Sequence, residues 1–246
     1  FAAATYLRGI SYIQLPTSLL SMVDSSIGGK TGVDFNTYKN MVGAFYQPAG
    51  VYINLDTLHS LSEKEFISGL GEIIKHGLIK DREYYEWIKA NHLQIEERDL
   101  SILQELVYRS CMIKKAVVEE DFKENGERAL LNFGHTIGHS VEKLMNFWLA
   151  HGECVAIGMA ASAGLSYMRG NITKEEQEDV VNTIKTFKLP TRITGLLKEE
   201  ILKVTKLDKK MNHGKINFIL LEEIGKAVID NSVTDEEILK ALDYIL

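Results

Sequence analysis

The chain has 246 residues, of which 45% are hydrophobic and 25% charged, the composition of a soluble globular protein with one large or two smaller domains. Its formal net charge of -6 at pH 7 argues against general binding of nucleic acid. The longest uncharged run, residues 154–168, is shorter than the about 20 apolar residues of a membrane span. We therefore expect no membrane association, and a tightly packed helix in that run.

The two cysteines indicate the cellular compartment, and the start of the chain indicates that it is a fragment. Cys111 and Cys154 lie far apart, without the spacing of a metal site, which is typical of thiols in a reducing compartment and predicts a cytoplasmic protein. The chain begins with Phe1 rather than Met, inside a stretch typical of a helix, and it shows no signal-peptide pattern. We expect a fragment from which an N-terminal portion is absent.

The first sixty residues predict part of an α/β domain. Residues 1–7 are typical of the end of a helix, and residues 10–15 of a short apolar strand. Residues 51–56 predict a second strand, which leads into a loop over residues 57–60.

Two short polar stretches follow the first predicted strand. Thr17 and Ser18 stand at its carboxyl end, where an α/β sheet places ligand contacts. Gly28 and Gly29 then precede Lys30, but the four residues that separate the glycines of a Walker loop are missing. Two interpretations stay open: a flexible turn that presents Lys30 to an anion, and a hairpin turn with an exposed lysine.

From residue 62 onward the pattern changes to helix. Ser62 and Glu65 form a capping box, and apolar residues then recur at spacings of three and four up to residue 188, without a proline. We place a domain boundary near residue 60, which makes 1–60 the remainder of an α/β domain and 61–246 a mainly helical domain. The fold class is α+β overall. The later predicted elements are helices over 103–118 and 173–187, a hairpin over 216–229 and a helix over 234–245.

Two stretches of the helical part carry side chains suited to a divalent metal. Residues 128–151 contain His135, His139 and His151, and the first two are four apart, on one face of a helix. The segment GEIIKHG supplies an acid, Glu72, whose apolar flanks predict burial, so that its carboxylate needs a partner such as a metal. Spacing alone favours His135 with His139. The alternative is that these are ordinary surface or core histidines.

Five blocks follow one another along the chain: LRGISYIQLPTSLLSMVDSSIGGKTGVDF, KNMVGAFYQP, GEIIKHG, GERALLNFGHTIGH and HGECVAIGM. Together they closely resemble the 3-dehydroquinate synthase family of the sugar phosphate cyclases, over almost the whole chain. The resemblance implies a dehydroquinate-synthase-like fold that lacks most of its N-terminal nucleotide-binding portion. It further implies a homodimeric enzyme with NAD and Zn²⁺ as cofactors, Co²⁺ being an alternative metal.

The reaction implied by the resemblance converts 3-deoxy-D-arabino-heptulosonate 7-phosphate to 3-dehydroquinate and phosphate, in the shikimate pathway of aromatic amino acid biosynthesis. It is a phosphorus–oxygen lyase reaction with transient oxidation by NAD, phosphate elimination, reduction and intramolecular aldol closure. One alternative is another sugar phosphate cyclase or a metal-dependent polyol dehydrogenase. A dehydrogenase would not need so many anion-binding residues. The other is a non-catalytic helical module, which would hold no zinc.

The resemblance also assigns residues, and it changes the metal set that spacing suggested. The implied metal ligands are Glu72, His135 and His151. The residues implied to face the substrate phosphate are Lys30, Asn40, His139, Lys209 (or Lys210) and, from a neighbouring subunit, Arg8. Those implied to hold the carboxylate and the ring hydroxyls are Lys75, Lys114, Arg128 and Asn132.

The implied NAD contacts come from the first part of the chain. They are Thr17, Ser18, Lys30, Lys39, Thr57, Leu58, His59 and Ser60. Asp24 and Lys39 are implied to lie between cofactor and substrate. Phe122 departs from the family, in which an acidic residue commonly follows the position of Asp121, and it touches none of the implied roles.

Overall fold

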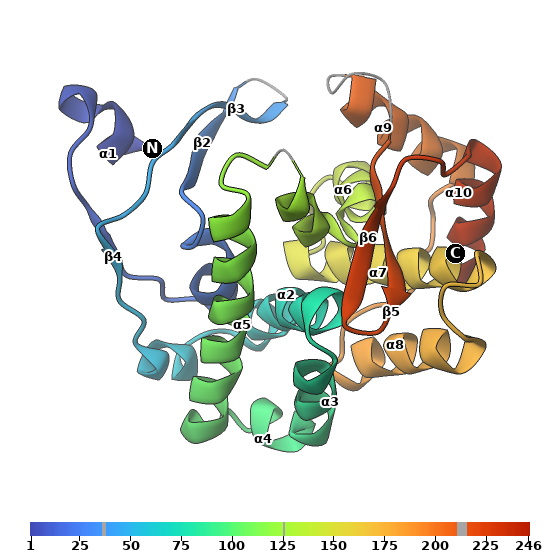
Figure 1. Cartoon of the computed structure of the whole chain (residues 1–246), viewed down its shortest axis with the longest axis horizontal. Coiled ribbons are helices and arrows are strands. Elements are labelled where there is room, and N and C mark those ends of the chain that lie inside the picture. The colour runs from blue at the N-terminus through green and yellow to red at the C-terminus, as the bar shows by residue number, and fades with distance from the viewer. Residues whose placement is uncertain (36–37, 125, 211–215) are drawn as a thin grey trace.

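The structure is a computed structural model that describes residues 1–35, 38–124, 126–210 and 216–246. Helices build most of the described chain, and three two-stranded sheets lie among and beside them. Figure 1 shows the N-terminal elements on one side of the long helices α2 and α5, and the C-terminal elements on the other. The α+β class expected from the sequence is confirmed.

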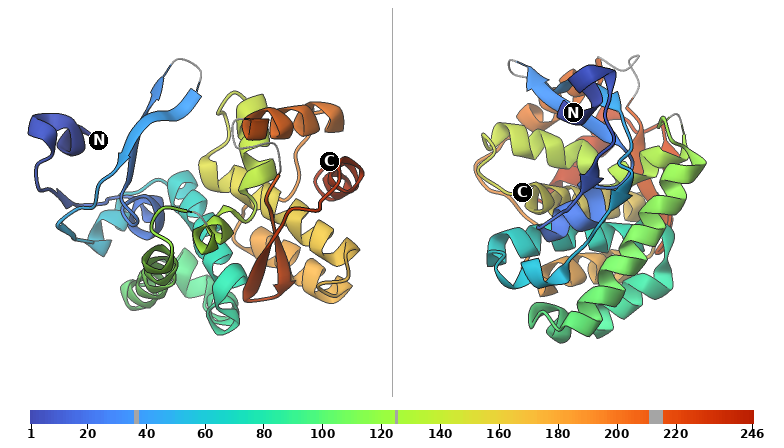
Figure 2. Two further views of the ribbon diagram at one scale, coloured as in Figure 1. Left: turned by 45° about the horizontal axis from the view of Figure 1, so that its top comes forward. Right: turned by 90° about the vertical axis from the view of Figure 1, so that its left-hand side faces the viewer.

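The N-terminal part contains short elements and one longer hairpin. In chain order these are α1 (Ala2–Thr5), η1 (Tyr6–Arg8), β1 (Ile13–Gln14), η2 (Ser21–Ser25), β2 (Lys30–Phe35), β3 (Tyr38–Phe45), β4 (Gly50–Val51) and η3 (Leu55–His59). Strands β1 and β4 pair in parallel over two residues each, so only a small part of each predicted strand is found. Strands β2 and β3 pair antiparallel, with Lys30 opposite Phe45, and project from the helical body in Figure 2.

The predicted helical run is confirmed as a series of separate helices. They are α2 (Glu63–Lys80), α3 (Arg82–Ala90), α4 (His92–Glu96), α5 (Leu100–Glu120), η4 (Glu127–Asn132), α6 (His135–Leu144), α7 (His151–Met168) and α8 (Lys174–Thr186). The hydroxyl of Ser62 caps α2 by accepting a hydrogen bond from the Glu65 N–H at 3.4 Å. The stretch 128–151 is not one helix, because Gly134 has a left-handed backbone with φ 79° and α6 starts after it.

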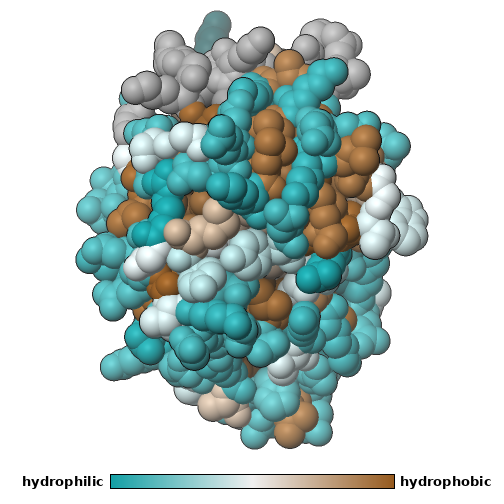
Figure 3. All heavy atoms as spheres, turned by 90° about the vertical axis from the view of Figure 1, so that its right-hand side faces the viewer, coloured by the Kyte–Doolittle hydropathy of each residue, from teal (hydrophilic) through white to brown (hydrophobic). Residues whose placement is uncertain are grey.

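The C-terminal elements follow the predicted order. They are α9 (Lys198–Lys210), β5 (Phe218–Glu223), β6 (Lys226–Asp230), α10 (Asp235–Ala241) and η5 (Leu242–Tyr244). Strands β5 and β6 form the expected hairpin, and Thr234 with Glu237 forms a capping box on α10. Figure 3, which views this side of the molecule, shows mainly hydrophilic side chains with smaller apolar areas between them.

Helix α7 joins two hydrophobic cores. Val155 and Met159 belong to one core, with residues of α2 and α5, whereas Ile157 and Ala161 belong to the other, with residues of α9, β5 and α10. Its residues Cys154 to Ser166 are all buried, which confirms the tightly packed helix expected over 154–168. None of the helices in the described part of the chain is long and apolar enough to cross a membrane.

The first core also includes residues from the N-terminal part. Leu19, Met22 and Leu58 are at most 1% exposed and pack in the same cluster as α2 and α5. The domain boundary near residue 60 therefore stays a prediction, with apolar packing that continues across it.

Candidate active site

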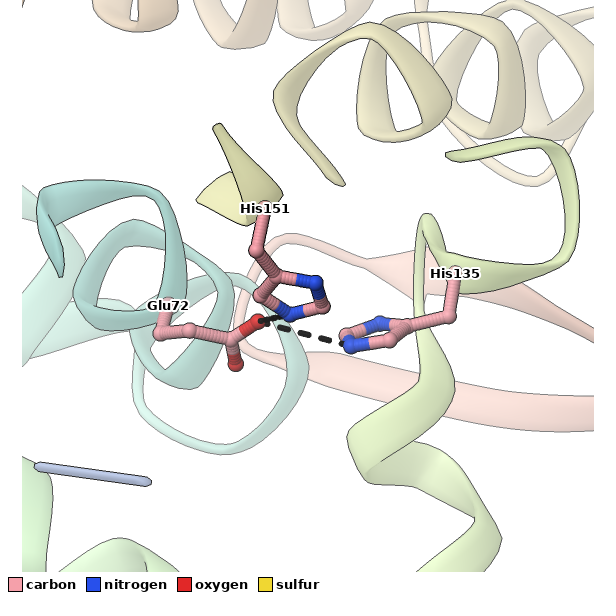
Figure 4. Close-up of side chains that lie close together, drawn as sticks. All are labelled: Glu72, His135 and His151. Carbon is pink, nitrogen blue, oxygen red and sulfur yellow. Dashed lines mark ion pairs between the residues drawn. The ribbon is translucent and has the colours of Figure 1, made fainter. Parts of the chain in front are cut away.

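Three side chains from three helices meet at one point. Glu72 lies in the middle of α2, whereas His135 and His151 are the first residues of α6 and α7. Glu72 Oε1 lies 3.4 Å from His135 Nε2 and 3.3 Å from His151 Nε2. Figure 4 shows the carboxylate of Glu72 facing both rings. One ligand atom of each residue lies within 4.8 Å of the others. The structure thus brings together the three residues that the family resemblance implied as metal ligands.

Two glycines allow the three helix backbones to approach closely. A Cβ on Gly152, in the first turn of α7, would lie 1.8 Å from the Ser68 carbonyl oxygen of α2. A Cβ on Gly158 would lie 1.8 Å from the carbonyl oxygen of Gly134, the residue before α6. Any side chain at either position would force two helices apart. The close packing of α7 against α2 and α6 therefore places the two helix-initial histidines beside Glu72.

Lys75 compensates the buried charge of Glu72 from one side. Its ammonium pairs with Glu72 Oε2, and both side chains are at most 1% exposed. Burial raises the pKa of Glu72, but the charge of Lys75 opposes it most strongly, and that pKa lies well below its usual range. The other oxygen, Oε1, is buried and accepts no hydrogen bond. A buried carboxylate oxygen that faces two imidazole nitrogens belongs to a donor set suited to a divalent cation.

The two histidines differ in their protonation. Burial lowers the pKa of His135 to about 3, so its ring is neutral and carries a lone pair. Burial acts the same way on His151, but the carboxylates of Glu142 and Glu72 outweigh it and raise the pKa to about 9. A metal that binds His151 Nε2 would displace the proton from that nitrogen. One carboxylate and two imidazoles fit Zn²⁺ with an open position for a substrate oxygen.

A cavity of about 650 Å³ opens beside this cluster, a size suited to a small metabolite. One wall is the β2–β3 hairpin, with Thr31, Gly32 and Phe45, and the opposite wall is made of helices and η4. The implied site residues that line it are Asp24, Lys30, Lys75, Lys114, Arg128, Asn132, His135, His139 and His151. These include all of the cations implied to hold the carboxylate and the ring hydroxyls.

Each cation of the cavity wall already has an oxygen partner. Lys114 pairs with the side chain and the backbone carbonyl of Asp24, and this lysine holds the pKa of Asp24 below its usual value against the effect of burial. Lys30 pairs with Glu124, which also accepts a hydrogen bond of 3.0 Å from Asn132. Glu124 was missed by the sequence analysis, since it lies in a charged turn typical of solvent.

Arg128 connects the two walls of the cavity. Its guanidinium is buried and donates to the Gly28 carbonyl at 3.0 Å and to the Phe122 carbonyl at 2.7 Å. The Phe122 ring also packs on Phe45 of β3, with ring centroids 5.4 Å apart. The expectation that Phe122 touches no implied role is therefore wrong, because both its backbone and its ring lie at this junction.

The structure describes the glycine-rich stretch before Lys30. Gly28 and Gly29 have φ of 104° and 65°, and Lys30 is the first residue of β2 rather than part of a hairpin turn. Its side chain is half exposed and lines the cavity. The stretch is therefore not a hairpin turn, and a role of Lys30 toward an anion stays a prediction.

Other implied residues lie away from the cavity or outside the description. Thr17, Ser18, Arg8 and residues 57–60 do not line the cavity found among the described residues. The Leu58 side chain is 1% exposed within the core, so only its backbone can face a cofactor. The side chains of Lys39, Asn40, Lys209 and Lys210 lie outside the described part of the structure. The NAD and phosphate contacts implied for these positions stay predictions.

Comparison with known proteins places the chain in a family. A sequence model described as "3-dehydroquinate synthase C-terminal" matches residues 69–211, more than half of the chain, and one described as "3-dehydroquinate synthase N-terminal" matches residues 1–68. The chain belongs to the 3-dehydroquinate synthase family. A 3-dehydroquinate synthase from Acetivibrio thermocellus is 47% identical over 240 residues, which cover 98% of this chain and 67% of that protein. One from Thermodesulfovibrio yellowstonii is 46% identical over 245 residues, 99% of this chain and 68% of that protein.

Solved structures show the same family fold. A 2-epi-5-epi-valiolone synthase from Streptomyces hygroscopicus, with NAD⁺ and Zn²⁺ bound, matches 98% of this chain and 68% of its own with a TM-score of 0.92 and 31% identity. A 2-deoxy-scyllo-inosose synthase at 23% identity and a TM-score of 0.89 has the same fold over 70% of its length. The chain thus spans about two-thirds of the proteins it matches.

Proposed function

We propose that this chain is the catalytic part of a 3-dehydroquinate synthase that uses NAD and a divalent metal, Zn²⁺ or Co²⁺. The observation that carries the proposal is the buried Glu72 Oε1, which faces His135 and His151 beside a cavity rich in cations. The 47% identity to a named 3-dehydroquinate synthase supports the substrate. The substrate is then 3-deoxy-D-arabino-heptulosonate 7-phosphate, and the products are 3-dehydroquinate and phosphate.

The cofactors supply the chemistry that side chains cannot. NAD, when bound, would accept a hydride from a ring carbon that carries a hydroxyl and later return it, and a metal held by Glu72, His135 and His151 would polarise substrate oxygens. We assign the cofactor contacts to Thr17, Ser18, Asp24, Lys30, Lys39 and the stretch Thr57, Leu58, His59 and Ser60. These contacts rest on the family resemblance.

The protein groups bind and orient a doubly charged substrate. Lys75, Lys114, Arg128 and Asn132 would hold the carboxylate and the ring hydroxyls by charge-assisted hydrogen bonds. His139, whose ring centroid lies 5.1 Å from that of His135, would contact the phosphate beside the metal. The other phosphate contacts that we propose are Lys30, Asn40, Lys209 or Lys210, and Arg8 of a second copy.

Glu124 adds a charge-balancing role at the phosphate end. Its carboxylate pairs with Lys30 and accepts a hydrogen bond from Asn132. A phosphate that reaches Lys30 would replace Glu124 as the partner of that ammonium. The exchange would keep Lys30 paired before and after phosphate departs, so neither state leaves its charge uncompensated.

Another sugar phosphate cyclase activity is the second candidate, since a cyclase of different product shares 31% identity and the fold. The higher identity to 3-dehydroquinate synthases favours the first. We further propose, on the family resemblance, a cytoplasmic homodimer with an α/β part up to residue 60 and a helical part after it.

The test is phosphate release from the heptulosonate phosphate by the full-length protein with NAD below stoichiometric amounts. We expect phosphate to exceed NAD many times over, without accumulation of NADH, and a chelator to stop its release. The variant His135→Ala is the matched control and should release none. Stoichiometric NADH, or no phosphate release by the metal-loaded protein, would overturn the proposed function.

A further inference from the structure

Glu142 is a buried acid beside the candidate metal site that none of the proposed roles uses. It lies on α6, one turn after His139 and two turns after His135, so it shares their face of the helix. Its side chain is 9% exposed and does not line the cavity. A carboxylate in this place cannot contact a substrate in the cavity, so any role in the site must act through another residue.

His151 is that other residue, because its two ring nitrogens face two different carboxylates. Nε2 lies 3.3 Å from Glu72 Oε1, and Nδ1 lies 3.9 Å from Glu142 Oε1. At 3.9 Å the two groups lie within ion-pair distance of each other. Nδ1 of His151 therefore has a carboxylate acceptor on the side away from Glu72.

We infer that Glu142 is a positioning residue, which holds the Nδ1–H of His151 and directs the lone pair of Nε2 at the metal. The inference rests on the proposed metal site. A neutral imidazole carries one proton, and an acceptor at Nδ1 keeps that proton there. The same acceptor fixes the ring plane and makes Nε2 more basic, and losing such a partner typically lowers metal affinity by about 10- to 100-fold.

The structure gives a reason to prefer this role to direct ligation by Glu142. His139, Glu142 and His151 also form a group whose ligand atoms lie within 4.8 Å of one another. A metal there would bind Nδ1 of His151, on the side of the ring that faces Glu142, and Glu142 does not line the cavity in which a substrate would reach the metal. In the orienting role, Nδ1 of His151 faces Glu142 and Nε2 faces Glu72. His139 is then no metal ligand, and it lines the cavity.

The scaffold keeps Glu142 and His151 at this separation. The close contact of Gly158 with Gly134 packs α7 against α6, and the segment between the helices folds back so that the Phe147 N–H donates to the Glu142 carbonyl at 3.0 Å. His151 then begins α7 beside the second turn of α6. Because both residues lie on packed helices rather than in a loop, Glu142 can hold the imidazole in one orientation.

The test compares zinc affinities, measured by competition with a chelator of known affinity, for the wild type, Glu142→Gln and Glu142→Ala. We expect about 10- to 100-fold weaker binding in Glu142→Ala and a smaller loss in Glu142→Gln, whose amide oxygen still accepts a hydrogen bond. Ser140→Ala is the matched control. It removes another buried polar group of α6, which bonds Thr205 at 2.8 Å, and should bind zinc as the wild type does.

Three outcomes would count against the inference in different ways. Zinc affinity within twofold of wild type in both Glu142 variants would overturn it, provided that His135→Ala no longer binds zinc. Loss in Glu142→Gln as complete as in His135→Ala would show that Glu142 is itself a ligand. A wild-type protein that binds no zinc would overturn the proposed function, and the inference would fall with it.

Discussion

The buried pair of Lys75 and Glu72 is the residue-scale feature on which the candidate site depends. Both charges are removed from water, and each is compensated mainly by the other. Such a pair contributes little net stability, but removing one partner leaves an uncompensated buried charge. Lys75 therefore has a structural role in the metal-free protein, besides its proposed contact with the substrate.

We predict that Lys75→Ala destabilises the metal-free protein by about 3 to 5 kcal/mol, the usual cost of breaking a buried ion pair. The measurement is chemical unfolding in the presence of a chelator. Lys115→Ala is the matched control, because it removes an exposed lysine of α5 whose pair with Glu119 spans 3.6 Å. A loss in Lys75→Ala no larger than that in the control would contradict this account.

Sequence spacing found the metal residues only in part, and the structure gives the reason. Spacing favoured His139 because it lies on the same helix as His135, and the two rings are indeed neighbours, with centroids 5.1 Å apart. His151 faces Glu72 because it begins a different helix, α7, which packs against α2 through Gly152. A contact between helices has no periodic signature, so only the family resemblance pointed to His151.

At the scale of elements, close helix contacts position the site. Gly152 is the point where α7 touches α2, at Ser68, which lies one turn before Glu72 along α2. Its N–H donates to the Ser68 hydroxyl at 3.0 Å. The distance between these two helices therefore sets the distance from His151 to Glu72.

Gly152→Ala should push α7 away from α2, because the added Cβ would lie 1.8 Å from the Ser68 carbonyl oxygen. We expect a loss of about 1 to 3 kcal/mol in unfolding free energy, together with weaker zinc binding. Gly50→Ala is the control, since a Cβ at Gly50 meets no atom within 4 Å. Wild-type zinc affinity in a folded Gly152→Ala protein would show that the helix contact does not position the ligands.

Arg169 at the end of α7 connects this helix to α10. Its guanidinium donates to Glu237 at 2.9 and 2.8 Å and to Asp230 at 2.6 Å. The hydrogen bonds from Arg169 lower the pKa of Glu237 from 4.5 to about 2. Because the folded-state pKa is depressed, the stabilisation is fully present above the unfolded pKa of 4.5 and is lost as the pH falls through about 2.

Glu237→Gln should thus cost about 1 to 2 kcal/mol near neutral pH, because the pair is partly open to solvent, and progressively less in acid. The measurement is the difference in unfolding free energy between wild type and variant from pH 7 downward. Glu236→Gln, at the exposed neighbouring position, is the control. A difference that stays constant down to pH 2 would show that ionisation of Glu237 does not stabilise the fold.

The sequence predicted helices better than strands. Helix boundaries with a capping residue were found, as at Ser62 and Thr234, because a cap is a local signal. The β2–β3 hairpin was missed, since glycines interrupt its alternation and Val33, Val42 and Phe45 are exposed apolar residues. A strand whose apolar side chains face solvent or a cavity does not show the pattern of a half-buried sheet.

At the scale of the whole molecule, the candidate metal site joins helices that belong to both hydrophobic cores. Glu72 comes from α2 in the first core, whereas α6 places Ile137 and Val141 in the second and α7 contributes to both. A metal held by all three helices would bind the folded state only, because the unfolded chain does not bring the ligands together.

Zinc at a free concentration of 100 times its dissociation constant should therefore raise the unfolding free energy by about 2.7 kcal/mol. The measurement is chemical unfolding with zinc and with a chelator. His135→Ala should show no such difference. An equal gain in that variant would mean that zinc stabilises the protein at another place.

The general architecture was accessible from the sequence because apolar periodicity and the long family blocks cover most of the chain. The internal arrangement was not, as Arg128 shows. The family resemblance implied a guanidinium that holds the substrate carboxylate, and the structure has it donating to the carbonyls of Gly28 and Phe122 from opposite walls of the cavity. Contacts between residues 100 positions apart depend on how the walls pack, which one sequence does not contain.

Anomalous scattering at the zinc absorption edge, from crystals of the zinc-loaded protein, tests the central claim most directly. The account predicts one peak per chain, about 2.0 to 2.2 Å from Glu72 Oε1, His135 Nε2 and His151 Nε2. A peak on His139 and Glu142, a peak on Asp24 and His76, or no peak near Glu72 would contradict it.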